Sequence, residues 1–119
     1  MSWNEGPKAF TAGAGLLAKR RVKIAAGTTT TPPEVVYAGA GEAYVGITER
    51  DSALGELVSV KLRNQGGTFE VAAAGAFAVG ADLYGTANGQ VDDVVSGAIQ
   101  FTAVESATAA GDIVEVLPV

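Results

Sequence analysis

The chain has no cysteine and no histidine among its 119 residues. The missing cysteine excludes disulfides and thiolate-bound metals. The missing histidine removes the side chain that most often transfers protons near neutral pH and most often binds metals. Ser-His-Asp triads, Cys-His pairs and histidine zinc sites therefore cannot be built from this chain. We expect a protein that is not an enzyme and that holds neither a cofactor nor a metal.

Charged residues are also scarce, at 18% of the chain, where about 25% is usual for a soluble domain. Such low charge, with abundant alanine and glycine, suggests that part of the surface is covered in an assembly. The net charge of −5 disfavours direct binding of nucleic acid. No apolar run reaches the roughly 18–20 residues of a membrane span. The first ten residues lack the charged-then-apolar pattern of a secretion signal.

Two stretches of the chain, Tyr44–Val60 and Gln100–Val116, repeat one pattern. Each has a glutamate, then a small residue, a glycine, an acid and an alternating apolar tail. The matched positions are Glu49 and Glu105, Ala53 and Ala109, Gly55 and Gly111, Glu56 and Asp112, Leu57 and Ile113, Val58 and Val114, and Val60 and Val116. The pattern predicts a strand, a tight glycine turn and a second strand, used twice in one small β domain.

Short alternating segments predict most of the other strands. The expected strands cover residues 19–24, 34–38, 42–48, 56–63, 68–72, 81–86, 90–95, 98–104 and 112–117. We expect 56–63 and 68–72 to form a hairpin, and Asn88-Gly89 to form a type I′ hairpin turn. No segment has the apolar stripe of a long helix. The sequence therefore predicts an all-β fold, a small barrel or sandwich of short antiparallel strands.

Half of the basic residues lie in the segment 19–24. Its alternation predicts that Val22 and Ile24 face the core while Arg21 and Lys23 face solvent. A solvated strand face is the preferred interpretation. A phosphate-binding patch is the alternative, and it lacks nearby aromatic residues at stacking spacing.

Residues 1–18 look irregular, because Pro7 and the glycines at 13 and 15 favour no single conformation. We expect an extended N-terminal arm over 1–18 and a single β-rich domain over 19–119. Trp3 and Phe10 stand out in the arm. They either fold back on the chain's own core or dock on another protein, since Trp and Phe are enriched in interface cores.

Acidic and glycine-rich motifs do not match any known reactive pattern. Glu49 and Asp51 flank an arginine and are interpreted as a solvated turn rather than a glycosidase pair. The segment 13–15 does not match a phosphate-binding loop. Asp92-Asp93 lacks the further oxygen ligands of a calcium loop.

Several segments resemble, in their order and spacing, the capsid cement or decoration proteins of tailed bacteriophages. The resemblance covers roughly residues 20–119. It is carried by the segments 21–23, 41–47, 53–60, 80–84, 89–91 and 109–117. Each motif is ordinary strand-and-turn sequence, and the resemblance lies in their succession.

This resemblance implies a β-rich protein of the virion, made in the host cytoplasm, that binds the exterior of the expanded head. It would bridge major capsid proteins as a homotrimer and stabilise the shell against DNA pressure. An N-terminal arm would lie on the shell, which makes Trp3, Lys8 and Phe10 candidate capsid-binding residues by position. The alternatives are another phage module, from a tail or baseplate, or a carbohydrate-binding domain. For the last of these, the aromatic residues show no spacing that groups them on one face.

Overall fold

The computed structural model describes residues 8–119 as ten short strands and one 3₁₀ turn. The strands are β1 (Lys8–Ala12), β2 (Arg21–Ile24), β3 (Glu34–Tyr37), β4 (Gly46–Thr48), β5 (Leu57–Leu62), β6 (Phe69–Ala72), β7 (Asp82–Gly85), β8 (Val91–Asp92), β9 (Phe101–Ala103) and β10 (Ile113–Pro118), and the turn is η1 (Ala87–Gly89). The prediction of an all-β fold, as a small barrel or sandwich of short strands, is confirmed, and the structure contains a closed barrel.

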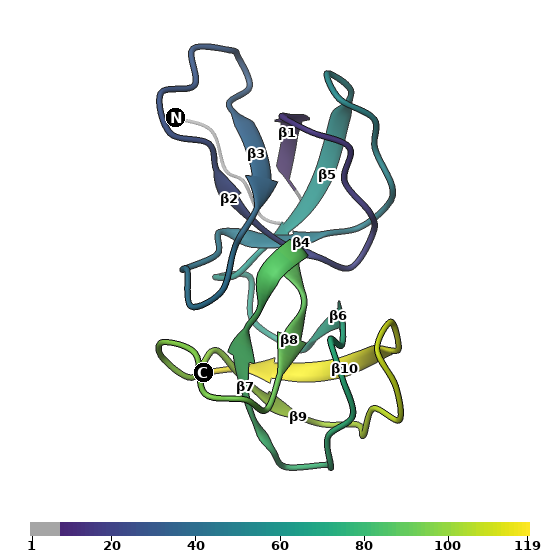
Figure 1. Ribbon diagram of the computed structural model, residues 1–119. Helices are drawn as coiled ribbons and strands as arrows, with labels where there is room; N and C mark the ends of the chain where they lie inside the picture. The colour runs from purple at the N-terminus through teal and green to yellow at the C-terminus, as the bar shows by residue number, and fades with distance from the viewer. Residues whose placement is uncertain (1–7) are drawn as a thin grey trace.

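The strands form two five-stranded units, which lie one beyond the other along the molecule (Figure 1). The first unit is a closed barrel in the order β1-β3-β2-β4-β5. The second is a sheet in the order β6-β10-β9-β7-β8, and it curls until Ala73, next to β6, forms a parallel bridge with Val91 of β8. The molecule measures 39 × 27 × 23 Å.

The second unit repeats the strand pairing of the first. The antiparallel pairs β1–β5, β4–β5, β2–β4 and β2–β3 correspond to β6–β10, β9–β10, β7–β9 and β7–β8. The parallel pair β1–β3 corresponds to the parallel bridge between Ala73 and Val91. The internal repeat in the sequence marks only the last two strands of each unit, so the structural repeat of five strands extends well beyond the sequence pattern.

The repeated glycine turns have matching hydrogen bonds. Gly55 and Gly111 both have positive φ, at 85° and 93°, a conformation that glycine adopts without strain. The Gly55 amide donates to the Ala12 carbonyl at 2.8 Å, and the Gly111 amide donates to the Ala73 carbonyl at the same distance. The prediction of a strand, a glycine turn and a second strand, used twice, is therefore confirmed.

The acid that follows each glycine closes its turn. The Asp112 Oδ2 atom accepts hydrogen bonds from the amide and the hydroxyl of Thr108, each at 2.9 Å. In the first unit the Glu56 Oε1 atom accepts from the Ala53 amide at 2.7 Å. Hydrogen bonding to Thr108 lowers the pKa of Asp112 below its ordinary value of 3.8. The matched acids therefore have a structural function in both units.

The predicted hairpin between residues 56–63 and 68–72 is wrong. Strand β5 already pairs with β1 on one edge and with β4 on the other. Strand β6 begins the second unit and pairs with β10. The glycine-rich turn at 64–67 connects two units instead of two paired strands.

The hairpin at Asn88-Gly89 is confirmed, since both residues have positive φ and the turn joins antiparallel strands β7 and β8. The strand predicted over 90–95 ends early, at Asp92. Val94 and Val95 instead lie in the connection to β9 and are exposed.

Each unit has its own apolar core. The first core contains Phe10, Val22, Val35, Val58 and Val60, together with Ala12 and Leu16. The second core is centred on Phe69, Phe101 and Val116 and also takes in Tyr44 and Ile47 from the first half of the chain. The Tyr44 and Phe101 ring centroids lie 5.0 Å apart. Apolar packing therefore continues across the junction between the units.

Arg21 lies at this junction, and the expectation that it faces solvent is wrong. Its side chain is fully buried, at 0% exposed, whereas Ile24 is 47% exposed. One side of β2 faces the first core, and the guanidinium on the other side is covered by the second unit. It donates to six oxygens at 2.7–3.2 Å: the carbonyls of Ala38, Gly39, Glu42, Thr86 and Gln90, and the Gln100 side-chain oxygen.

Burial lowers the pKa of Arg21 to about 10, so the guanidinium is still charged at neutral pH. Its place requires small neighbours. A Cβ atom added at Gly85 would lie 2.5 Å from Arg21 Nη1, which is closer than two such atoms can approach. The pairing of one long cation with a glycine-lined junction holds the units in one arrangement.

Replacing Arg21 with methionine should strongly destabilise the chain, because six buried or partly buried acceptors lose their donor. An unsatisfied buried acceptor costs about 1–3 kcal/mol, so we expect a loss of about 3–5 kcal/mol in the free energy of unfolding, measured by urea denaturation. The free energy of unfolding of Arg21→Lys should lie between those of Arg21→Met and the parent, since an ammonium has only three donors. The exposed Arg50→Met serves as control and should change stability by less than about 0.5 kcal/mol. Equal stability of the Arg21→Met and Arg50→Met variants would contradict this role.

Replacing Asp112 with asparagine should destabilise the chain at neutral pH and have less effect in acid. A carboxyl whose pKa is lowered by folding stabilises the native state above its unfolded value of 3.8, and this stabilisation disappears as the pH falls through the lowered folded value. Urea midpoints of parent and variant across this range provide the measurement. Asp82→Asn, at an exposed position on β7, is the control. A difference in urea midpoint between parent and variant that does not change with pH would show that the ionised Asp112 carboxylate does not stabilise the turn.

Candidate functional site

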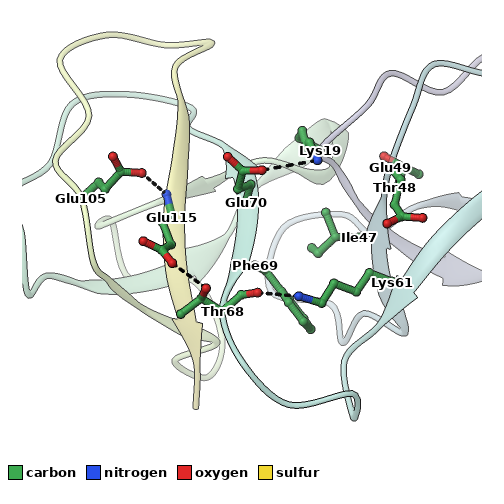
Figure 2. Close-up of a pocket in the computed structure, with 10 residues that line it drawn as sticks. All are labelled: Lys19, Ile47, Thr48, Glu49, Lys61, Thr68, Phe69, Glu70, Glu105 and Glu115. Carbon is green, nitrogen blue, oxygen red and sulfur yellow. Dashed lines mark hydrogen bonds and ion pairs between the residues drawn. The ribbon is translucent and has the colours of Figure 1, made fainter. Parts of the chain in front are cut away.

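A groove of about 470 Å³ lies between the two units (Figure 2). One side is formed by Glu70, Glu105 and Glu115 of the second unit, and the other by Thr48, Glu49 and Lys61 of the first. Lys19, Ile47, Thr68 and Phe69 complete the lining. The groove thus exists because β6 and β10 of one unit face β4 and β5 of the other.

The two lysines of the groove bind groups of the second unit. Lys61 donates to the Thr68 carbonyl at 2.6 Å, and its ammonium lies 4.7 Å from the centroid of the Phe69 ring. Lys19 forms an ion pair with Glu70, with 3.6 Å between Nζ and Oε1. Both contacts join residues from opposite sides of the junction. The contacts of Lys19 and Lys61 thus line the groove and also connect the two units.

The carboxylates of the groove are also engaged by the chain. Glu115 accepts from the Thr68 hydroxyl at 2.5 Å, and Glu105 accepts from the Glu115 amide at 2.7 Å. Glu49 accepts from the Ser59 hydroxyl at 2.6 Å. Within residues 8–119 no group of three or more acids is placed to hold a metal ion. The groove thus has a polar lining whose carboxylates are hydrogen-bonded to the chain itself.

Exposed apolar side chains are more numerous on the second unit. It holds eight of the twelve large hydrophobic residues that are exposed in the described part of the chain: Val79, Val94, Val95, Ile99, Val104, Ile113, Leu117 and Val119. Val95 is 75% exposed. Exposed single hydrophobic residues are common, so this distribution shows only that the second unit has the more apolar surface.

The structure places two of the three residues predicted to bind a capsid. Lys8 and Phe10 lie in β1, and the Phe10 side chain is 3% exposed within the first core. The Lys8 ammonium lies 6.0 Å from the Phe10 ring centroid. Trp3 lies outside the described residues. Residues 8–18 of the predicted arm thus belong to the first unit in this structure, and the capsid-binding role of all three residues stays a prediction.

Sequence reasoning missed the burial of Arg21 and the early end of β8. Alternation predicts a solvated face for Arg21 because it does not reveal a second covering layer. It also extends the strand over Val94 and Val95, although their position between two aspartates and Ser96-Gly97 is typical of a loop. The groove lining comes from segments as far apart as Lys19 and Glu115, so no local motif marks it.

No part of residues 8–119 forms a helix with the length and apolarity needed to cross a membrane. A search of curated protein sequences finds no match to the chain.

Two comparisons identify what the chain is similar to. Among solved structures it is similar to the N base of the head fiber gp8.5 of bacteriophage phi29, with a TM-score of 0.74 and 21% sequence identity over 95% of this chain and 92% of that one. At this identity the likeness shows a shared fold. The family model of phage cement proteins matches residues 8–118, which is nearly the whole chain. The chain therefore belongs to the phage cement proteins, a family of structural proteins of the phage head.

Proposed function

We propose that this chain is a capsid decoration protein. It binds the exterior of the expanded phage head, bridges neighbouring major capsid proteins as a homotrimer, and stabilises the shell against the pressure of packaged DNA. The observation that carries the proposal is the match of the cement family to residues 8–118. We also propose that it acts without catalysis, as a component of the virion.

The exposed surface of the molecule is large enough for several protein–protein interfaces. A standard interface buries about 800 Å² on each partner, and the chain exposes 5960 Å², so several such contacts fit on one copy. Joining several modest contacts in one particle raises the effective concentration of each, which lets weak individual contacts hold the shell firmly. Preference for the expanded shell would stabilise that form by mass action.

A rigid junction supports the same function. A protein that bridges two capsid subunits transmits force only if its two ends keep a fixed spacing. Arg21, Lys19 and Lys61 each bond from the first half of the chain to the second. These contacts favour a body that resists bending between its two units.

A second candidate function follows from the fold. The neighbour of known structure is described as the base of a head fiber, so this chain is also a candidate base for a protein that projects from the head. Electron microscopy of decorated shells separates the two candidates. Density that extends beyond a body of this size would favour a base, and density limited to the chain would favour decoration alone.

Mixing the purified chain with expanded, undecorated shells should bring it into the pellet on sedimentation at micromolar concentration. Precursor shells should retain less of it, because a ligand stabilises the state that it prefers. A known decoration protein on its own shells provides the positive control. Recovery of the chain in the supernatant, while the control sediments, would refute the proposal.

Removing residues 1–7 or replacing Trp3 with alanine should weaken shell binding without unfolding the chain. An aromatic anchor at an interface contributes about 2 kcal/mol or more, which corresponds to roughly a 30-fold loss of affinity. Thermal melting checks the fold, and Ser2→Ala is the matched control in the same segment. Shell affinity equal to that of the parent would show that the arm does not bind the capsid.

A further inference from the structure

The charges of the chain are divided between its two halves. Residues 1–63 contain all eight lysines and arginines and six of the thirteen acids, a net charge of +2. Residues 64–119 contain the remaining seven acids and no lysine or arginine, a net charge of −7. The division falls between β5 and β6, which is the boundary between the two structural units.

Little of this opposite charge is neutralised by ion pairs between the two units. The units lie along the 39 Å axis of the molecule (Figure 1). Within residues 8–119 the only ion pair from the second unit to a cation is Glu70 with Lys19, at the junction. The other pair, Lys23 with Glu42, lies within the first half of the chain. Six acids of the second unit therefore have no cationic partner among the described residues.

One outer face of the second unit combines acid with exposed apolar surface. Asp82 of β7 pairs with Thr102 of β9, which pairs with Leu117 of β10, so the three side chains lie in a row across the sheet. Tyr84 and Asp92 lie opposite each other on the neighbouring strands. We call these five residues the acidic face. Leu117 is 48% exposed on it.

The corresponding strand of the first unit combines apolar and basic side chains. Residues 57, 59 and 61 alternate outward along β5, and Arg63 follows with the same spacing. Leu57 and Arg63 are exposed, and Lys61 is partly exposed. We call Leu57, Ser59, Lys61 and Arg63 the basic face. Lys61 donates to the Thr68 carbonyl and Arg63 lies over the Tyr44 ring, but neither forms an ion pair with a carboxylate in the described part of the chain.

We propose that copies of this chain associate head to tail, with the acidic second unit of one copy against the basic first unit of the next. A two-fold contact between second units would bring two bodies of charge −7 together, which like-charge repulsion opposes. A head-to-tail contact instead joins opposite charges and covers exposed apolar residues on both sides. Contacts of this type generate closed rings when the rotation between copies closes.

This contact rests on the homo-oligomer of the proposed function and specifies which surfaces form it. A second copy is the occupant that the structure favours, because the same molecule carries both the acidic surface and its basic complement. A basic surface on the shell protein is the competing occupant, and the experiments below distinguish the two.

Carbodiimide cross-linking tests the arrangement directly, since it joins a lysine to a carboxylate only where the two are in contact. Unlabelled and ¹⁵N-labelled copies are mixed, cross-linked at low ionic strength in solution and on decorated shells, and digested. We expect mixed-isotope links between lysines of residues 8–61 and acids of residues 70–115. Links between copies that join lysines only to acids of residues 34–56, or no links between copies in either setting, would overturn the proposal.

A charge exchange tests the electrostatic cause. Asp82→Lys/Asp93→Lys, at exposed positions of the second unit, and Arg50→Glu/Arg63→Glu, at exposed positions of the first, should each weaken self-association at least about tenfold. The four changes together should restore it. Glu5→Lys/Glu34→Lys alters the net charge as much as the first variant but within the first half, and should not weaken association. Analytical ultracentrifugation over a salt series provides the measurement. If the variant with all four substitutions does not regain self-association, the proposal is overturned.

Shell sedimentation of the same variants separates this proposal from the proposed function. If both double variants self-associate as strongly as the parent and still bind shells, the head-to-tail contact is refuted and the decoration function is unaffected. Loss of shell binding in Asp82→Lys/Asp93→Lys with unchanged self-association would show that the acidic second unit binds the shell protein, and it would also refute the head-to-tail contact. Loss of binding by the parent itself would refute the decoration function alone.

Discussion

The buried guanidinium of Arg21 is the contact on which the arrangement of the two units depends. It donates to carbonyls of the segment 38–42 and to Thr86, Gln90 and Gln100 of the second unit. Burying a charge is costly unless all its donors are satisfied, so the surrounding backbone has to keep its geometry. The glycines around this side chain leave space for it, as the close approach at Gly85 shows. A local requirement for hydrogen bonding thus fixes how the barrel and the second sheet are placed relative to each other.

The repeated architecture gives two similar bodies with different surfaces. Both units use the same order of strand pairs and the same glycine turn closed by an acid. Their outer positions differ, because the first half has all the basic residues and the second has none. Backbone hydrogen bonds and core packing set the shared fold, whereas outward side chains are free to differ. The chain can therefore present two distinct contact surfaces on one repeated frame, which suits a protein of the phage cement family.

Much of the fold could be predicted from the sequence, and the failures have physical causes. The glycine turns at Gly55 and Gly111 and the hairpin at Asn88-Gly89 were correct because positive φ depends on the local residue. The hairpin between 56–63 and 68–72 was wrong because both edges of β5 are taken by strands distant in sequence. The site was less predictable, since the groove joins residues from Lys19 to Glu115.

The sequence by itself determined the absence of histidine and cysteine chemistry, the short strands, the turns and the likeness to cement proteins. The first three depend on residue type and on patterns within about ten residues, and the likeness depends on the order of such patterns along the chain. Only the tertiary structure decided that Arg21 is buried, that the pairing repeats over two whole units, and that the boundary between the units coincides with the change in charge along the chain. The physical reason is that alternation of apolar and polar residues predicts a strand with one buried face. Whether a second layer covers the other side depends on contacts between segments far apart in the chain.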